Sequence, residues 1–440
     1  MKSTLRITAP LMVLLALLAV AVGWSADAQA PNLESFKVYD LGTLPGGTSS
    51  FAFDMNDGGW VAGSSTMTPD GLYQHGVFWH AGHVTDLGTL GGPNSEAGGP
   101  NAGLEVPLIS ETLQVDPNGE DFCGFGTHLQ CLAAVWKPNG SHPLSGTLTA
   151  LTPLPGGNNS QAYGLNNRGQ VIGFAENDTA EPTCITPSQV RRFEPVIWGR
   201  DGDIRQLRLP AMDTVGFGFG INDRGQAVGA SGLCSNTVIP PLPDITARHA
   251  VLWEEDGSPT DIGGLGGAAH IASSINNRSD VVGSSQLADG SVHAFLWTRE
   301  TGMQDLGTLP DDFFSVAPCC RTVNDRRQVV GFSIGPTGPR AFLWQDGVMR
   351  DLNDLVPGSP LYLLFAQAIN SRGEIAGIGV TNTGELHAFL ASPNDGAPGG
   401  SSFSSGPSGA TNMGHVNLPE NVRKLLEQRL RRFGGSRQNR

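Results

Sequence analysis

The chain has 440 residues, of which 15% are charged, and its 60 glycines and 30 prolines make up about a fifth of the total. This composition excludes helical bundles and coiled coils, whereas a 39% hydrophobic content excludes wholesale disorder. The net charge of −14 excludes a body that binds nucleic acid without regard to sequence.

Residues 1–28 are predicted to be a signal peptide. Lys2 and Arg6 precede an apolar run at 11–22 that is too short to span a bilayer comfortably, and cleavage is expected after Ala28. An uncleaved anchor is the alternative. No later stretch reaches the ~18 consecutive apolar residues of a membrane helix. We therefore expect a secreted, extracellular or periplasmic protein that does not span the membrane.

One sequence unit recurs seven times between residues 36 and 391. Each copy has an anchor, normally an Asn after an apolar residue, at spacings of 46 to 60 residues. The anchors are Asn56, Asp116, Asn166, Asn222, Asn276, Asn324 and Asn370. A small residue precedes each anchor by four positions, Thr112 in the second copy, and a Gly follows by seven, or by eight at Gly124. The segment 93–107 is interpreted as an irregular insertion.

The positions of the unit predict four short strands. Stretches such as Asn-Asp-Arg-Gly at 222–225 predict tight turns, in which the Asn carboxamide bonds the backbone and Gly supplies a positive φ. A buried strand follows, then a strand such as His-Ala-Phe-Leu-Trp at 293–297, then one that ends in Asp-Leu-Gly-x-Leu. Four strands per ~50 residues are typical of a propeller blade.

The two ends of the repeat region complement each other. The seventh copy stops at Leu390 without a fourth strand, while residues 36–44 form a fourth strand that no copy precedes. A strand from the N-terminus would complete the last blade and remove both sheet edges. The sequence therefore predicts an all-β, seven-bladed β-propeller at 36–391, closed by an N-terminal strand.

Three motifs together resemble the HAF-repeat family of bacterial extracellular proteins. They are Asp-Leu-Gly-Thr-Leu-Gly-Gly at 86–92, the Asn-x-x-Gly turn, and His-Ala-Phe-Leu-Trp at 293–297. The resemblance covers roughly residues 36–391 and implies export and a repeated structure, without assigning catalytic residues. The second copy departs most, with Asp116 for Asn and Leu132 where His would stand.

Six cysteines in an exported chain suggest disulfides. Two long loops, at 176–192 and 233–248, fall on adjacent copies and hold one cysteine each, which predicts Cys184–Cys234. Cys123 and Cys131 flank one turn and are expected to pair. Cys319 and Cys320 form either a vicinal disulfide or two buried thiols. Because loops on a rigid scaffold often carry binding, Arg191, Arg192 and Arg248 are predicted to shape a binding face there.

The sequence gives weaker evidence for metal and catalytic sites than for the disulfides. His75, His249, His293 and His387 occupy one repeat position on different copies, too far apart for shared zinc, and a structural hydrogen bond within each blade is expected. Residues 116–121 resemble part of a calcium loop but lack the spacing of an EF-hand. We therefore expect no cofactor, with bound calcium as the weaker alternative. No catalytic motif is recognisable, and no catalytic or metal residue is assigned.

The C-terminal 49 residues differ from the repeats. Residues 392–414 read as a flexible linker rich in Gly, Ser and Pro. In 415–440, Val422, Leu425, Leu426, Leu430 and Phe433 recur at helical spacing and predict a short basic amphipathic helix. This tail has seven basic and two acidic residues, while the mature body before it has 18 basic and 38 acidic ones. The tail either contacts an anionic surface or a partner, or folds back on the acidic body.

The functional expectation is a non-catalytic binding or scaffold module. Its partner would be a protein or glycan of the cell envelope or exterior, and no nucleic acid. The alternative is a secreted propeller enzyme that acts on polysaccharide, a glycoside hydrolase or lyase with carboxylates from different blades.

Overall fold

The computed structural model describes residues 35–140, 142–184, 189–236, 247–319 and 321–394. The predicted signal peptide at 1–28, most of the predicted linker at 392–414 and the predicted helical tail at 415–440 lie outside the described residues. Within the described residues, no helix is long and apolar enough to cross a membrane.

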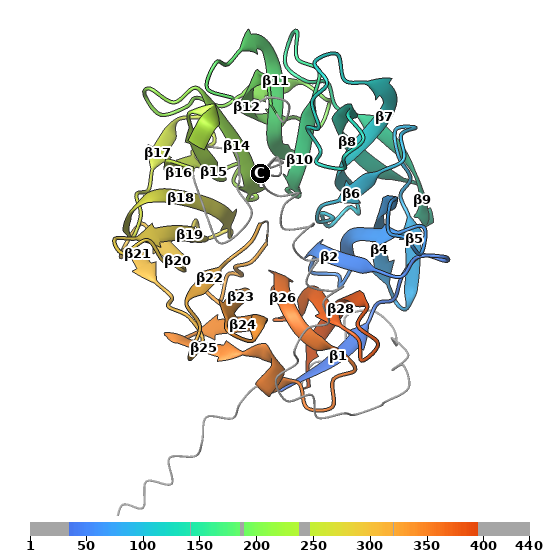
Figure 1. Ribbon diagram of the computed structural model, residues 1–440, viewed down its shortest axis with the longest axis vertical. Helices are drawn as coiled ribbons and strands as arrows, with labels where there is room; N and C mark the ends of the chain where they lie inside the picture. Colours follow the sequence, from blue (N-terminus) through green and yellow to red (C-terminus); the bar gives the residue numbers. More distant parts are fainter. Residues whose placement is uncertain (1–34, 141, 185–188, 237–246, 320, 395–440) are drawn as a thin grey trace, which may run out of the picture. The chain divides into compact units, whose positions relative to one another are not determined.

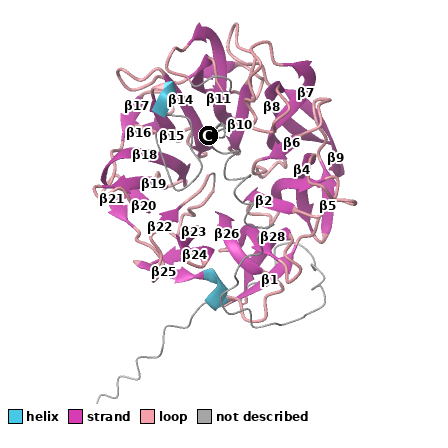
Figure 2. Cartoon of the chain, in the orientation of Figure 1, coloured by secondary structure: helices cyan, strands magenta, loops and turns pink. Residues whose placement is uncertain are grey.

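Five sheets of four strands form most of the structure (Figures 1 and 2). The first holds β2 (Ser50–Met55), β3 (Val61–Thr66), β4 (Gln74–His80) and β5 (His83–Asp86). The second holds β6 (Ser95–Ala97), β7 (Val106–Val115), β8 (Leu129–Asn139) and β9 (His142–Ala150). The third holds β10 (Ser160–Leu165), β11 (Val171–Ala180), β12 (Arg191–Trp198) and β13 (Ile204–Gln206). The fourth holds β14 (Val215–Ile221), β15 (Ala227–Gly232), β16 (His249–Trp253) and β17 (Pro259–Asp261), with the 3-10 helix η1 (Cys234–Asn236) after β15.

The fifth sheet joins the two ends of the described chain. It holds β26 (Tyr362–Ile369), β27 (Ile375–Val380), β28 (Leu386–Pro393) and β1 (Phe36–Asp40). β1 runs antiparallel along β28, from Phe36 opposite Pro393 to Asp40 opposite Phe389. Because β28 continues to Pro393, Ser392 and Pro393 belong to this strand rather than to the expected linker.

The remaining repeats form one sheet of eight strands. It holds β18 (Gly266–Ile275), β19 (Val281–Leu287), β20 (Val292–Thr298), β21 (Gly302–Asp305), β22 (Phe314–Val316), β23 (Val329–Gly335), β24 (Gly338–Gln345) and β25 (Val348–Asp351), followed by the 3-10 helix η2 (Leu352–Leu355). One parallel pair, Val292 with Phe314, connects β20 to β22. The sheets surround a common centre (Figure 1). The prediction of an all-β propeller is confirmed.

A β-bulge on the innermost strand explains the two small positions of the unit. Ala52 pairs with Gly63, and the register shifts directly after Ala52. At Gly63 an added Cβ would collide with the main-chain oxygen of Phe51, so only glycine fits. The same collision with the preceding strand occurs at Gly173, Gly229, Gly283 and Gly377.

The asparagine turns are linked into a circuit. Asn222 Oδ1 accepts the N–H groups of Arg224 at 3.0 Å and Gln226 at 3.1 Å, and Gly225 has a φ of 80°. Asn222 Nδ2 donates to the carbonyl oxygen of Asn276, in the next turn, at 3.0 Å. Equivalent bonds of 2.9–3.4 Å run in order through Asn56, Asn101, Asn166, Asn222, Asn276, Asn324, Asn370 and back to Asn56. The predicted turn is confirmed, and its amide also ties each repeat to the next.

The second repeat differs from the sequence alignment, in which Asp116 was the anchor. Its anchor in the structure is Asn101, and its innermost strand is β6, so 93–107 is a regular part of the repeat. Ala97 is its small residue and pairs with Leu108 instead of a glycine. Asp116 begins the connection from β7 to β8. Thr112 and Gly124 therefore do not hold the repeat positions assigned to them.

Apolar side chains of the innermost strands pack together. One cluster includes Phe51 on β2, Phe219 on β14 and Phe365 on β26. Beside it, Arg321 Nη1 donates to the carbonyl oxygen of Met55 at 3.0 Å, and Arg321 Nε lies 3.7 Å from Asp54 Oδ1. The innermost strands are thus joined by both apolar contacts and an ion pair.

Candidate functional site

The connections between strands lie on two opposite faces of the propeller. We call one the turn face: it carries the asparagine turns and the connections from the third to the fourth strand of each repeat. The other, the loop face, carries the connections from the second to the third strand and from each fourth strand to the next repeat. The two sets alternate because consecutive strands within a repeat are antiparallel.

A disulfide joins two long connections of the loop face. Residues 181–190 connect β11 to β12, and residues 233–248 connect β15 to β16 on the adjacent sheet. Cys184 and Cys234 are bonded, with their Cα atoms 4.7 Å apart. This predicted pair is confirmed. Residues 185–188 and 237–246 of these connections lie outside the described residues.

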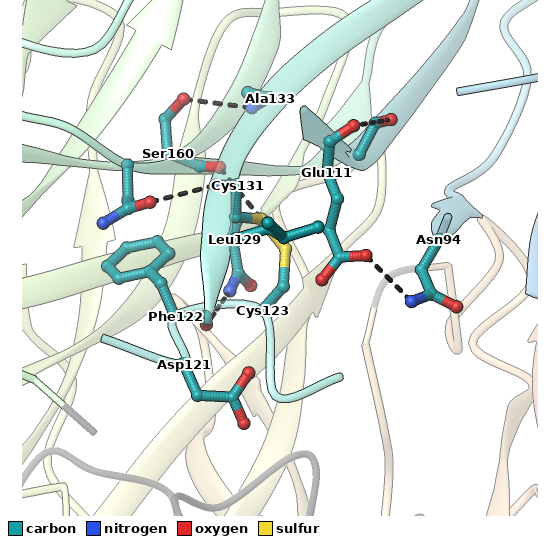
Figure 3. The surroundings of a disulfide bond; sticks show 12 residues. Asn94, Glu111, Asp121, Phe122, Cys123, Leu129, Cys131, Ala133 and Ser160 are labelled. Atoms are coloured by element: carbon teal, nitrogen blue, oxygen red, sulfur yellow. Dashed lines mark hydrogen bonds between the residues drawn. A yellow bond between two sulfur atoms is a disulfide. The ribbon is translucent and has the colours of Figure 1, made fainter. Parts of the chain in front are cut away.

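A second disulfide, Cys123–Cys131, lies at the connection from β7 to β8 (Figure 3). The Cys131 N–H donates to Asn159 Oδ1 at 3.0 Å, which fastens this connection to the neighbouring sheet. The predicted pair is confirmed. Cys319 is disulfide-bonded as well, so it is not one of two buried thiols, and Cys320 lies outside the described residues.

The three predicted arginines are not gathered into one cluster. Arg191 donates to the carbonyl oxygen of Gly156, and Arg192 Nε lies 3.1 Å from Glu181 Oε2. The Arg248 side chain is exposed. Two of the three are thus bonded to neighbours inside the protein, and their predicted role in binding stays a prediction.

The recurring His belongs to a polar pair between the third and fourth strands. His75 Nδ1 lies 2.9 Å from Asp86, and the His293–Asp305 and His387–Asp40 pairs are alike at 2.9 and 2.8 Å. Arg340 and Asp351 replace the pair at 3.1 Å, while His249 Nδ1 instead bonds Asp213 at 2.7 Å. The predicted hydrogen bond within the blade is confirmed, with the fourth-strand Asp as partner for three of the four histidines; His249 bonds Asp213, just before β14 of its own sheet, and its Nε2 lies 3.9 Å from the fourth-strand Asp261.

The third repeat has Glu194 in the His position, a residue that the sequence analysis missed. Burial raises the pKa of Glu194 to about 7, partly opposed by Arg192 and by a hydrogen bond from Gln206. The signal was available, since Glu194 precedes Trp198 by four residues as His293 precedes Trp297. A carboxyl group with such a pKa could exchange a proton near neutral pH.

A pair of carboxyl groups lies between the β6–β9 and β10–β13 sheets. Glu120 and Glu176 hydrogen-bond to each other, and burial raises the pKa of both, that of Glu176 to about 8. Glu176 Oε2 accepts the backbone and side-chain N–H groups of Asn159 at 3.0 Å each, and Glu120 accepts the N–H of Val190. The pair therefore shares a proton at neutral pH and links two loop-face connections.

These three carboxyl groups are buried. Glu120 and Glu176 are completely buried, and Glu194 is 5% exposed. In the predicted calcium loop, Asp116 Oδ1 accepts the N–H groups of Asn118 and Glu120, and Oδ2 accepts Asn159 Nδ2. No group of His, Cys, Asp and Glu within the described ranges could hold a metal ion.

Exposed apolar side chains gather on the loop face. Of the eight large ones that the described residues contain, only Leu144 and Val348 lie toward the turn face. The other six are Leu72, Tyr73, Leu113, Val115, Met212 and Phe313. Sequence reasoning missed them, because single apolar residues in connections give no periodic signal.

The two faces also differ in the charges of their exposed side chains. Among described loop-face residues, ten exposed side chains are acidic and two are basic, Arg208 and Arg248. The acidic ones are Asp40, Asp70, Asp86, Asp178, Asp261, Asp289, Asp305, Asp311, Asp354 and Glu385. In the described turn-face connections, eight exposed acidic residues are nearly balanced by seven exposed arginines. The loop face is therefore the acidic and apolar one.

The sequence matches no family model and no curated protein. The structure is similar to puromycin hydrolase, with a TM-score of 0.46 and 15% identity over 73% of this chain and 48% of that one. It is also similar to the Pyrococcus horikoshii acylaminoacyl peptidase (0.43, 11%, over 78% and 51%) and to streptogramin B lyase (0.43, 10%, over 81% and 98%). The chain spans about half the length of the first two proteins. At these identities the similarities concern the fold alone.

Proposed function

We propose that this chain is an exported, non-catalytic binding module that holds an anionic partner, a protein or a glycan, on the loop face. The site would lie over the β10–β13 and β14–β17 sheets, around the connections that Cys184–Cys234 joins. The observation that carries the proposal is the exposure of three side chains on the connections of these two sheets. Met212, 86% exposed, and both exposed loop-face arginines, Arg208 and Arg248, belong to connections of these two sheets. An exposed apolar side chain and two exposed arginines on connections of adjacent sheets suit the recognition of carboxylate or phosphate groups.

We further propose a ring of seven blades, with β18–β25 counted as two blades and β1 as the fourth strand of the last. The circuit of seven asparagines and the single pair between β20 and β22 support this count. The five-residue pairing of β1 with β28 supports closure by the N-terminal strand. A signal peptide cleaved after Ala28 and membership of the HAF-repeat family belong to the same proposal.

The test compares a triple variant, Arg208→Ala with Met212→Ser and Arg248→Ala, with the wild-type chain. The immobilised proteins are probed with a panel of anionic glycans and acidic peptides. Arg200→Ala is the matched control, because Arg200 is an exposed arginine of the turn face on the same sheet as Arg208. We expect at least a tenfold loss of affinity in the triple variant alone. Equal retention by all three proteins would remove the proposal.

The enzyme alternative has its own outcome in the same assay. Release of shortened glycan by the wild-type chain, abolished by Glu194→Gln, would replace binding with catalysis. Glu194 is chosen because its pKa of about 7 is the one nearest to that of a neutral-pH acid or base.

A further inference from the structure

A second part of the loop face combines exposed apolar and acidic side chains. Leu72 and Tyr73 lie in the connection from β3 to β4, and Leu113 and Val115 lie at the end of β7 on the next sheet. Leu113 and Val115 are 77% and 71% exposed. The two sheets are in direct contact, since the Gly76 N–H on β4 donates to Ser95 Oγ on β6 at 2.8 Å. We call these four residues the apolar patch.

Exposed carboxylates lie on the same and on the adjacent sheet of the loop face. Asp70 and Asp86 belong to the sheet of Leu72, and Asp40 and Glu385 belong to the adjacent β26–β28 sheet. All four are exposed. Both exposed loop-face arginines in the described chain lie elsewhere, in connections of the β10–β17 sheets. The patch therefore fits a ligand with an apolar stripe and basic flanks.

The chain itself contains such a segment. Residues 415–440 carry Leu425, Leu426, Leu430 and Phe433 at helical spacing, with seven basic and two acidic residues. We propose that this C-terminal segment docks on the apolar patch of its own propeller. The segment lies outside the described residues, and the proposal rests on its sequence and on the patch.

The geometry of the chain permits this contact. The described chain ends after β28, whose sheet adjoins that of Leu72: the Ala388 N–H donates to Ser50 Oγ at 2.9 Å. β28 ends on the turn face, so the chain must pass one strand length, about 26 Å for its eight residues, to reach the loop face. The 20 residues at 395–414 reach up to about 66 Å when extended. A tether of this length also gives a millimolar effective concentration, so a weak contact suffices.

The proposal needs no external ligand, and its patch shares no residue with the site proposed above. Hydrogen–deuterium exchange of the full chain at low ionic strength tests it. We expect amides within 420–434 to exchange about fivefold more slowly than in the variant Leu113→Ser/Val115→Ser. Because coupling is reciprocal, Leu425→Ser/Leu426→Ser should speed exchange at 110–116. Val348→Ser, which removes an exposed apolar side chain of the turn face, should change neither segment.

Three results would overturn the proposal. The first is exchange at 420–434 that is the same in the patch variant and the wild type. The second is protection that grows with protein concentration, which would assign the patch to a second copy. The third is protection that appears only with vesicles of anionic lipid, which would assign the segment to a membrane surface.

Discussion

The turn face and the loop face are fastened in different ways. On the turn face one contact, from an Asn side chain to the next Asn carbonyl, is repeated around the whole circuit. On the loop face the ties are local: two disulfides, a buried pair of carboxyl groups and separate His–Asp pairs. A repeated tie constrains every copy of the unit equally. Local ties leave the other connections free to differ in length and composition, which suits a face that binds.

Removing the longer disulfide should have the largest effect on stability. The variant Cys184→Ala/Cys234→Ala frees a loop of 50 residues, and we expect the free energy of unfolding to fall by about 3 to 4 kcal/mol. Urea unfolding measures it. The matched variant Cys123→Ala/Cys131→Ala, with a separation of eight residues, should lose less. A larger loss from the shorter loop would contradict this account.

Breaking the circuit of asparagine hydrogen bonds at one position should have the next largest effect on the free energy of unfolding. Asn222→Ala removes two bonds within the turn, one to Asn276 and one to Gln226 Oε1, all buried or half-buried. We expect a loss of about 2 to 3 kcal/mol in the free energy of unfolding by urea. Asp201→Ala, at an exposed turn-face position, should stay within about 0.5 kcal/mol. A loss below about 1 kcal/mol for Asn222→Ala would mean that the circuit is incidental.

The shared proton of Glu120 and Glu176 makes the free energy of unfolding depend on pH. The folded state holds a proton that the unfolded state releases near pH 4.5, so stability should fall as pH rises from about 4.5 to about 8. The pair should contribute at most about 1.4 kcal/mol per pH unit to this slope, because it holds one proton, and Glu194, whose pKa is raised as well, adds a slope of its own. Glu120→Gln should lower the total slope, since the amide can donate to Glu176 without titrating. Denaturant unfolding at a series of pH values measures both slopes, and an unchanged slope in the variant would exclude the pair as its origin.

The smallest effect is expected at the apolar patch. Leu113→Ser/Val115→Ser changes side chains that are mostly exposed, so the free energy of unfolding should change by less than about 0.5 kcal/mol. Thermal unfolding by circular dichroism checks it. A loss above about 1 kcal/mol would show that these side chains support the fold, and the exchange test above would then need Leu72→Ser/Tyr73→Ser instead.

The sequence predicted the unit well where local and tertiary requirements coincide. Backbone geometry requires the Asn of the turn and the glycine opposite the bulge. Each residue type therefore recurs at a fixed spacing, which makes it recognisable in the sequence. The second repeat shows the limit. Asp116 makes the same backbone contacts within its turn as an anchor Asn does, so local chemistry alone could not exclude it. What separates Asn101 from Asp116 is a bond to Asn166, 65 residues away.

The candidate sites were less predictable for a related reason. Cys184–Cys234 followed from loop lengths in the repeat alignment, and Cys123–Cys131 followed from the turn that the two residues flank; both pairs are correct. The loop-face apolar side chains and the Glu120–Glu176 pair depend on which connections become neighbours. Glu176 meets Glu120 only because the β7–β8 connection reaches the next sheet, and no spacing in the sequence encodes that contact.

The pairing of β1 with β28 determines when during synthesis and folding the last sheet can form. Asp40 and its partner His387 are 347 residues apart, so β1 is made first and can pair only after almost the whole chain has been made. Long-range pairing of this kind is slow, because a large loop must close before any contact stabilises it. Until β28 is available, β1 has an unpaired edge, which can pair with other chains. A chain that ends before residue 386 should therefore fold incompletely and associate through that edge.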